Sequence, residues 1–130
     1  MQFPTILLAL ATTALVSATN LECNAAQPQL TEPRVANIVD QLRDAGDALI
    51  AVQRNGPCPR IACYGGTGAF ICSNDHEAFP SRQLGDIIDS KYKECYGHTP
   101  QSWQDDNAFN PAFEWFDDGF RVFVHGSENC

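Results

Sequence analysis

Residues 60–72 read RIACYGGTGAFIC, and this stretch sets the interpretation of the rest of the chain. Two apolar runs, Arg60–Tyr64 and Ala69–Cys72, flank the glycine-rich segment Gly65–Gly68. Glycine readily adopts the positive φ angles that tight hairpin turns require, and apolar runs around such a turn are typical of paired strands. The stretch therefore predicts an antiparallel β-hairpin in the middle of the chain.

An amphipathic helix is predicted on each side of this hairpin. Thr31 offers an N-cap oxygen, Pro33 suits a first helical turn, and the Asn55–Pro57 segment ends the pattern. The second helix opens at Pro80–Ser81 and stops at Gly97. Both have apolar residues at the spacing of three and four that places them on one face. These residues are Val35, Ile38, Val39, Leu42, Ala45, Leu49 and Val52 in the first helix, and Leu84, Ile87, Ile88, Tyr92 and Cys95 in the second.

Shorter strands are predicted near both ends of the chain. Leu21–Cys23 forms a brief first strand, and Phe120–His125 alternates apolar and polar residues as a final strand. Residues 98–119 contain two prolines and five acids and are predicted to form a long, irregular loop. The resulting order of strand, helix, two strands, helix and strand predicts an α+β fold, a split βαβ (βαββαβ) sandwich. It has a four-stranded antiparallel sheet with two helices on one face.

The N-terminus resembles a secretory leader. The apolar run Phe3–Leu15 is too short to span a hydrocarbon core of about 30 Å, and Val16 and Ala18 fit the small-residue positions of a cleavage site. We therefore expect residues 1–18 to be a signal peptide and residues 19–130 a single disulfide-stabilised domain. A chain exported to an oxidising compartment with six cysteines is expected to form three disulfides.

The predicted topology suggests one pairing of these cysteines. If the first and last strands are neighbours, Cys23 lies near Cys130. The second helix then brings Cys95 towards Cys63, and Cys58 pairs with Cys72 across the base of the hairpin. This assignment depends on the strand order being correct.

Charge narrows the range of partners. The chain has 16 acidic and 8 basic residues, a formal net charge of -8 at pH 7. Phosphate binding depends on clustered Lys and Arg, so an acidic chain is not expected to bind nucleic acid or anionic membranes. We expect a monomer without stable membrane insertion, without a cofactor and without a metal site, because the cysteine spacing lacks the close ligand pairs of zinc sites.

Parts of the chain resemble small secreted cysteine-rich proteins of filamentous fungi. The resemblance rests on Ile61–Cys63, Ile71–Asp75, the helix Leu84–Cys95 and the ending Arg121–Val124 to Cys130. The arrangement of these segments looks like that of fungal effector candidates, some of which share the α/β sandwich of viral killer toxins. The resemblance implies an extracellular protein, toxin-like or effector-like, that acts on a host or a competitor. This chain is acidic, however, whereas the killer toxins with more disulfides have a basic surface.

The binding residues are predicted from the density of aromatic side chains. Aromatic residues crowd the predicted loop, and exposed Trp and Phe anchor protein partners or sugar rings. Folding back over the core is the alternative role of these side chains. The predicted recognition surface also includes the helix-free face of the sheet, with Ile71 extending it. Its residues are Trp103, Phe113, Trp115, Phe116, Tyr64 and Phe123.

Two other functions are compatible with the sequence. A small secreted, ribonuclease-like hydrolase would use a carboxylate, an arginine and histidines to move protons and neutralise phosphate charge, here Glu77, Arg121, His125 and His76. Binding of a cell-wall glycan would use Trp103 and Trp115 as stacking platforms. The hydrolase requires its residues to converge in one cleft, and the glycan site requires two exposed, coplanar indoles.

Overall fold

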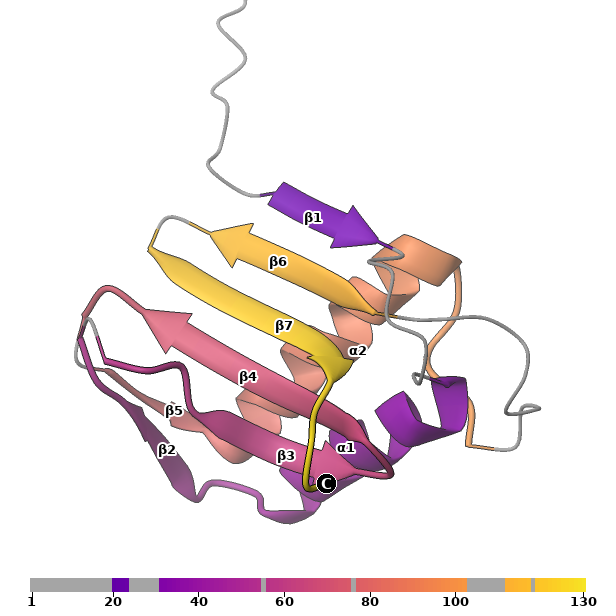
Figure 1. Ribbon diagram of the computed structural model, residues 1–130, viewed down its shortest axis with the longest axis horizontal. Helices are drawn as coiled ribbons and strands as arrows, with labels where there is room; N and C mark the ends of the chain where they lie inside the picture. The colour runs from indigo at the N-terminus through magenta and orange to yellow at the C-terminus, as the bar shows by residue number, and fades with distance from the viewer. Residues whose placement is uncertain (1–19, 24–30, 55, 76, 103–111, 118) are drawn as a thin grey trace, which may run out of the picture.

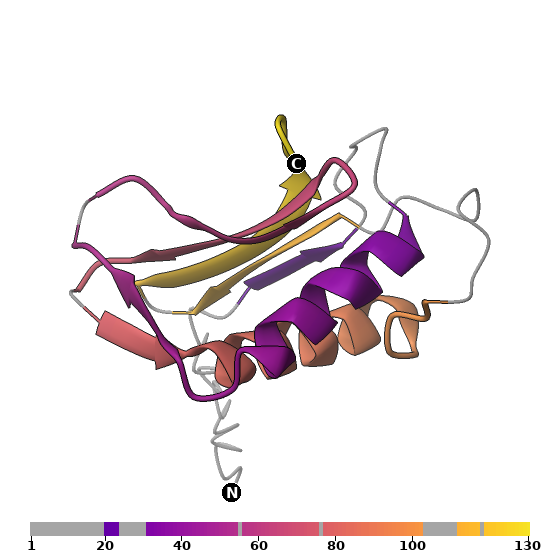
Figure 2. The ribbon, with the colours of Figure 1, turned by 90° about the horizontal axis from the view of Figure 1, so that it is seen from below.

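The computed structural model describes residues 20–23, 31–54, 56–75, 77–102, 112–117 and 119–130. Two helices, α1 (Glu32–Asp44) and α2 (Ser81–Tyr96), lie side by side beneath one face of an antiparallel sheet (Figure 2). That sheet contains β1 (Asn20–Cys23), β3 (Arg60–Tyr64), β4 (Thr67–Ser73), β6 (Phe113–Asp117) and β7 (Phe120–Gly126). Its strand order is β1-β6-β7-β4-β3 (Figure 1). The predicted α+β class with two helices on one face is confirmed.

The sheet differs from the predicted four-stranded one. It has five strands, and a separate two-stranded sheet is formed by β2 (Leu49–Val52) and β5 (Glu77–Pro80). The predicted adjacency of the first and last strands is wrong, because β6 lies between β1 and β7.

The central hairpin is confirmed. β3 and β4 are paired antiparallel, and Gly65 and Gly66 occupy the turn with φ angles of 58° and 83°. Side chains with a Cβ rarely adopt these angles, so the glycines select this turn. The hairpin forms one edge of the sheet, and β1 forms the other.

The first helix is shorter than predicted. It begins at Glu32 as expected, although Thr31 makes no side-chain capping hydrogen bond, and it ends at Asp44. Gly46 has a φ of 60°, which takes the chain out of the helical conformation. Leu49 and Val52 had the right spacing for the helix, but they belong to β2 instead.

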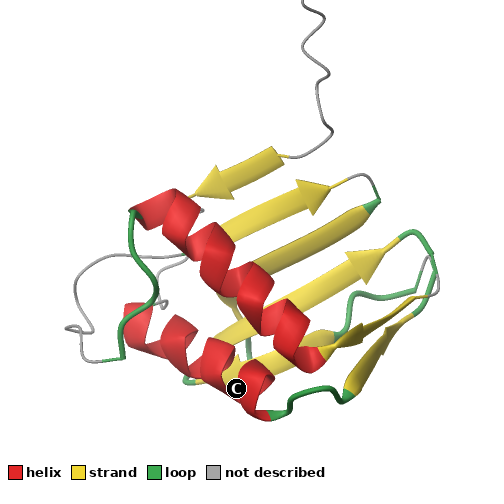
Figure 3. Ribbon diagram, turned by 180° about the vertical axis from the view of Figure 1, so that it is seen from behind, coloured by secondary structure: helices red, strands yellow, loops and turns green. Residues whose placement is uncertain are grey.

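The two helices are held together where α1 ends and α2 begins. The Ser81 hydroxyl donates to the Leu42 carbonyl at 2.7 Å, and the Ser81 backbone N–H donates to the Ala48 carbonyl at 2.8 Å. The Leu42 carbonyl lies in the last turn of α1 and the Ser81 N–H at the first residue of α2, where the backbone has no partner within its own helix. Figure 3 shows both helices crossing the back of the sheet along their full length.

The core lies between the helices and the sheet. Val35, Ile38 and Leu42 from α1 and Leu84, Ile88 and Tyr92 from α2 meet Ala69, Ile71, Phe113, Val122 and Val124 from the strands. All of these side chains are at most 2 % exposed. The predicted stripe is therefore the buried face of α2 and of α1 as far as Leu42, whereas Ala45 and Leu49 of the first stripe are exposed.

Three disulfides connect Cys23 to Cys95, Cys58 to Cys72 and Cys63 to Cys130. The Cys58–Cys72 assignment is confirmed. The predicted Cys23–Cys130 and Cys63–Cys95 pairs are wrong. The first assumed that β1 and β7 are adjacent, and the second assumed that the second helix brings Cys95 to the hairpin end near Cys63. In the structure Cys23 on the edge strand β1 is linked to the last turns of α2, whereas the chain beyond β7 crosses β4 and β3 to reach Cys63 (Figure 1).

Candidate binding surface

One face of the sheet carries neither α1 nor α2, and the alternation of side chains along β7 identifies which residues this face presents. Val122 and Val124 are fully buried on the helix side. Successive side chains of a strand point to opposite faces, so Arg121, Phe123 and His125 lie on the other side. We call this surface the helix-free face.

The pairing register extends this assignment to the neighbouring strands, because directly paired residues lie on the same face. One row across the sheet runs through Glu22, Glu114, Phe123, Phe70 and Arg60. The next row runs through Asn20, Phe116, Arg121 and Cys72. The helix-free face therefore combines aromatic rings with charges of both signs.

Three rings form the centre of this surface, and we call them the aromatic stack. The Phe70 and Phe123 centroids are 4.9 Å apart with an interplanar angle of 7°. His125 lies 4.8 Å from each of them, inclined by 22°. Phe123 is only 9 % exposed although no helix covers it, because its neighbours on the sheet pack around it. The stack is thus largely preformed.

Arg121 extends the aromatic stack towards β6. Its guanidinium carbon lies 4.5 Å from the Phe123 ring centroid and 5.2 Å from that of Phe116. It also forms an ion pair with Glu114, the cross-strand partner of Phe123. Stacking on two rings and pairing with a carboxylate fix the orientation of a long side chain that otherwise has many rotamers.

Disulfides and the C-terminal segment frame the surface. The Cys58–Cys72 bridge lies beside Arg121, which is the pairing partner of Cys72. At the other end, Arg60 donates hydrogen bonds to the Ser127 hydroxyl and to the Glu128 carbonyl, each at 3.1 Å. The Gly66 N–H donates to the carbonyl of Cys130 at 3.0 Å. These contacts fix the chain end across the β3–β4 hairpin.

A cavity of about 490 Å³ opens between the Cys58–Cys72 bridge and the end of the β6–β7 hairpin. Phe116, Phe120 and Arg121 line it together with Asn74. It provides a concave, partly apolar region next to the exposed part of Arg121. A binding partner has here both a charge to pair with and a recess to fill.

His125 is oriented by the backbone. Its Nδ1 lies 2.6 Å from the Gly126 carbonyl oxygen, which accepts a hydrogen bond only from a protonated ring nitrogen. In the neutral ring this leaves the lone pair on Nε2. The imidazole is therefore equipped to accept a proton or a hydrogen bond from a ligand.

The residues predicted for the recognition loop do not share one surface. Phe113, Trp115 and Phe116 form part of strand β6 instead of a loop. Phe113 is 1 % exposed and belongs to the core, whereas Trp115 is half-buried on the helix side, with the Lys91 Nζ 4.6 Å from its ring centroid. Of these three only Phe116 lies on the helix-free face. Trp103 lies outside the described residues.

Two of the hairpin residues also lie on the other side from Phe123. Tyr64 pairs with Thr67. Thr67 is three residues before Phe70 on the same strand, so its side chain points to the opposite face, which is the helix side of the sheet. Tyr64 is 47 % exposed there, beyond the edge of the core. Ile71 is fully buried beneath the sheet. The interpretation of Tyr64 and Ile71 as parts of the helix-free face is therefore wrong.

The residues of the predicted hydrolase site are divided between two parts of the fold. Arg121 and His125 share the helix-free face, but Phe123 lies between them on the same strand. Glu77 is on β5, where it accepts a hydrogen bond from the Ser73 hydroxyl at 3.3 Å and lines a different cavity. His76 is outside the described residues. The carboxylate that the structure places beside Arg121 is Glu114.

The third histidine, His98, has a structural position. Its Nε2 lies 2.6 Å from a carboxylate oxygen of Glu32, which is 2 % exposed, and its Nδ1 lies 3.1 Å from the Tyr96 carbonyl oxygen. Both ring nitrogens are thus occupied. The Glu32–His98 pair ties the start of α1 to the segment that follows α2.

Phe70 and Glu114 contact the aromatic stack or Arg121, and sequence reasoning did not select them. Phe70 lies in the predicted hairpin, and the alternation of that strand would have placed it opposite the buried Ile71. The sequence predicts a loop at Glu114, and a loop does not define the face to which a side chain points. Its role depends on the pairing of β6 with β7.

Comparison of the chain with protein-family models, with curated proteins and with solved structures found no match. Over the described residues, no helix has the length and apolar character needed to cross a membrane. Within the same residues, no three His, Cys, Asp or Glu side chains are grouped as a metal site. We therefore infer the function from the residues of the helix-free face.

Proposed function

We propose that this chain is a secreted binding protein that recognises an extracellular protein through its helix-free face. The observation that carries the proposal is the position of Arg121, stacked between Phe116 and Phe123 beside a cavity of about 490 Å³. Arginine and aromatic side chains are enriched among the residues that dominate protein–protein binding energy. A side chain held in place before binding loses less entropy when the partner arrives.

The partner is a protein of a host or of a competing organism, and this chain acts as a fungal effector or a toxin-like protein. Support comes from the predicted leader, from the three disulfides and from the resemblance to small secreted fungal proteins. The net charge of -8 favours a partner with a basic surface.

Site-specific photo-crosslinking tests this function. Residues 19–130 in their oxidised form receive a photoreactive phenylalanine analogue at Phe116, and separately at Asp44 on the exposed side of α1. Each variant is then incubated with extracellular proteins of candidate hosts and competitors. We expect a discrete adduct from position 116 and none from position 44.

A second variant checks that the adduct reflects recognition by this face. Arg121→Glu reverses the charge at its centre, and it should abolish the adduct formed from position 116. Equal crosslinking from positions 116 and 44, or an adduct unaffected by Arg121→Glu, would contradict the proposal.

Hydrolysis remains a second candidate because Glu114, Arg121 and His125 lie on one face. The orientation of His125, with Nε2 as the proton acceptor of the neutral ring, favours it. The Phe123 ring between Arg121 and His125 opposes it, since one phosphate would have to reach both. RNA cleavage by the oxidised protein that His125→Ala abolishes would establish this function in place of binding alone.

A further inference from the structure

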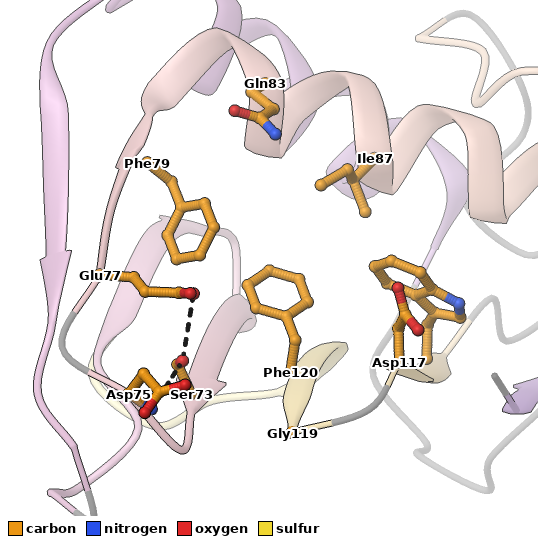
Figure 4. A pocket seen from close by; sticks show the side chains of 10 residues that line it. Ser73, Asp75, Glu77, Phe79, Gln83, Ile87, Asp117, Gly119 and Phe120 are labelled. Carbon is orange, nitrogen blue, oxygen red and sulfur yellow. Dashed lines mark hydrogen bonds between the residues drawn. The ribbon is translucent and has the colours of Figure 1, made fainter. Parts of the chain in front are cut away.

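A second cavity, of about 480 Å³, lies at the opposite side of Phe120 from the helix-free face. It is bounded by β5, by the first turns of α2 and by the β6–β7 hairpin. Figure 4 shows the Phe79 and Phe120 rings next to each other in its wall, with Ile87 on the helix above them. Its size falls within the range of ordinary ligand pockets.

The walls of this cavity are aromatic and aliphatic. Phe79 and Phe120 have ring centroids 4.9 Å apart, and Trp115 meets Phe120 edge-on at 5.8 Å. Phe79, Phe120 and Ile87 are each partly buried against the core. The walls therefore offer apolar contact to a short carbon chain and ring surfaces to a cation.

The rim of the cavity is acidic. Asp75, Glu77 and Asp117 line it, and the described residues that line the cavity include no lysine or arginine, while the Lys91 Nζ lies 4.6 Å from the ring centroid of Trp115 in its wall. Figure 4 shows the Glu77 side chain reaching towards Phe120, while Asp117 stands on the other side. The Ser73 hydroxyl holds Glu77 by donating to it at 3.3 Å, and it accepts the Asp75 backbone N–H at 3.2 Å. One hydroxyl thus orients the Glu77 carboxylate and holds the backbone of Asp75 at the rim.

We propose that this cavity binds an aliphatic chain that ends in a primary ammonium group. The alkyl part would lie against Phe79, Phe120 and Ile87, and the ammonium would face Glu77, Asp75 and the aromatic rings. Carboxylates attract a cation by charge, and aromatic faces attract it through their quadrupole. The net charge of -8 also raises the local concentration of cations around the protein.

Such a group has two natural sources, a free diamine and the lysine side chain of a protein. Both present the same chemistry to the cavity. The proposal stands on the cavity and not on the helix-free face, so it is independent of the proposed function.

NMR titration of the oxidised protein with 1,5-diaminopentane tests the proposal. We expect saturable shifts of the Phe79, Phe120 and Trp115 ring signals, and a titration with N-acetyl-lysine methylamide distinguishes a lysine side chain from a free diamine. 1-Pentanol has an apolar chain of similar length without the charge, and it should bind at least about tenfold more weakly.

Variants assign the binding to the cavity. Glu77→Gln should weaken diamine binding by about threefold or more, because it removes one rim charge. Glu22→Gln on the exposed edge strand is the matched control and should leave the affinity unchanged. Phe79→Leu keeps an apolar wall but removes a ring, and it should also weaken binding.

Three results would overturn the proposal. The first is the absence of saturable shifts up to about 20 mM diamine, which covers the range of measurable weak affinities. The second is an affinity for 1-pentanol equal to that for the diamine. The third is an equal loss of diamine affinity in Glu77→Gln and Glu22→Gln. Folding of each variant is checked by the upfield methyl signals of the core.

Discussion

Gly68 illustrates how one residue makes room for the aromatic stack. A Cβ at this position would lie 2.8 Å from Phe70 Cε2 and 2.8 Å from the Cβ of Ser127. Both are closer than carbon atoms approach in folded proteins, so the ring and the C-terminal segment rest on the bare backbone of β4. Position 68 therefore requires a residue without a Cβ atom.

We therefore expect Gly68→Ala to destabilise the fold by about 1–3 kcal/mol, the usual cost of overpacking. Urea denaturation measures this change. Gly97→Ala is the comparison, because its Cβ would meet nothing within 4 Å. The variant at Gly97 should cost only the strain of its positive φ, about 1 kcal/mol. A smaller loss at Gly68 than at Gly97 would contradict the close approach.

The buried Tyr92 makes the stability of the fold decrease at alkaline pH. Burial raises the pKa of its hydroxyl well above the ordinary value of 10.0, and the nearby Glu32 carboxylate raises it further. Tyr96 and His98 also face the ring. The folded state thus retains a proton that the unfolded state releases above pH 10, so the stability of the fold falls as the pH rises beyond that value.

Replacing Tyr92 with Phe should reduce this alkaline loss. We expect the free energy of unfolding of the wild type to fall more between pH 9 and about pH 11 than that of Tyr92→Phe. Tyr64→Phe is the control, because Tyr64 is 47 % exposed and should keep the wild-type dependence. Identical pH profiles for the wild type and Tyr92→Phe would show that Tyr92 does not limit alkaline stability.

At the scale of elements, β1 depends on its connection to α2. It is a four-residue edge strand that pairs only with β6, and the Cys23–Cys95 bridge ties it to the helix. So short a strand contributes few hydrogen bonds of its own. The bridge therefore determines whether β1 stays paired.

We expect the double variant Cys23→Ser/Cys95→Ser to lose about 2–4 kcal/mol of stability. Hydrogen exchange should show that amide protection is lost at Leu21–Cys23 and kept in β4 and β7. The Cys58–Cys72 bridge closes a shorter loop, with a sequence separation of 14 against 72, so Cys58→Ser/Cys72→Ser should cost less by about 1.5 kcal/mol. Protection retained in β1 without the bridge would contradict this dependence.

Element boundaries explain most of the differences between the predicted and the observed fold. In the segment 113–117 aromatic residues occupy both faces, Phe113 and Trp115 towards the core and Phe116 towards the helix-free face. The alternation that marks a half-buried strand is therefore weak, and the sequence predicts a loop where the structure has β6. Its turn signal, Asp118-Gly119, was in the sequence and is typical of hairpins.

At the scale of the whole molecule, the disulfides close the fold at three places. One bridge joins an edge strand to a helix, one crosses the base of the hairpin, and one fixes the last residue. The described cysteines contain no free thiol. The oxidised chain is thus braced at both edges of its main sheet.

Mass spectrometry of the oxidised, non-reduced protein tests this arrangement. Peptide mapping should recover the Cys23–Cys95, Cys58–Cys72 and Cys63–Cys130 linkages, and thiol titration in denaturant should detect no free cysteine. A Cys23–Cys130 peptide would contradict the strand order in which β6 separates β1 from β7.

The amino-acid sequence by itself determined the α+β class, the central hairpin, the buried stripes of both helices and the existence of three disulfides. These features follow from local signals, namely turn glycines, apolar periodicity and an even cysteine count. The tertiary structure alone decided the strand order, two of the three disulfide pairings and the partners of Arg121. The physical reason is that pairing between distant strands depends on how their faces fit together in the folded chain, and no single segment carries that information.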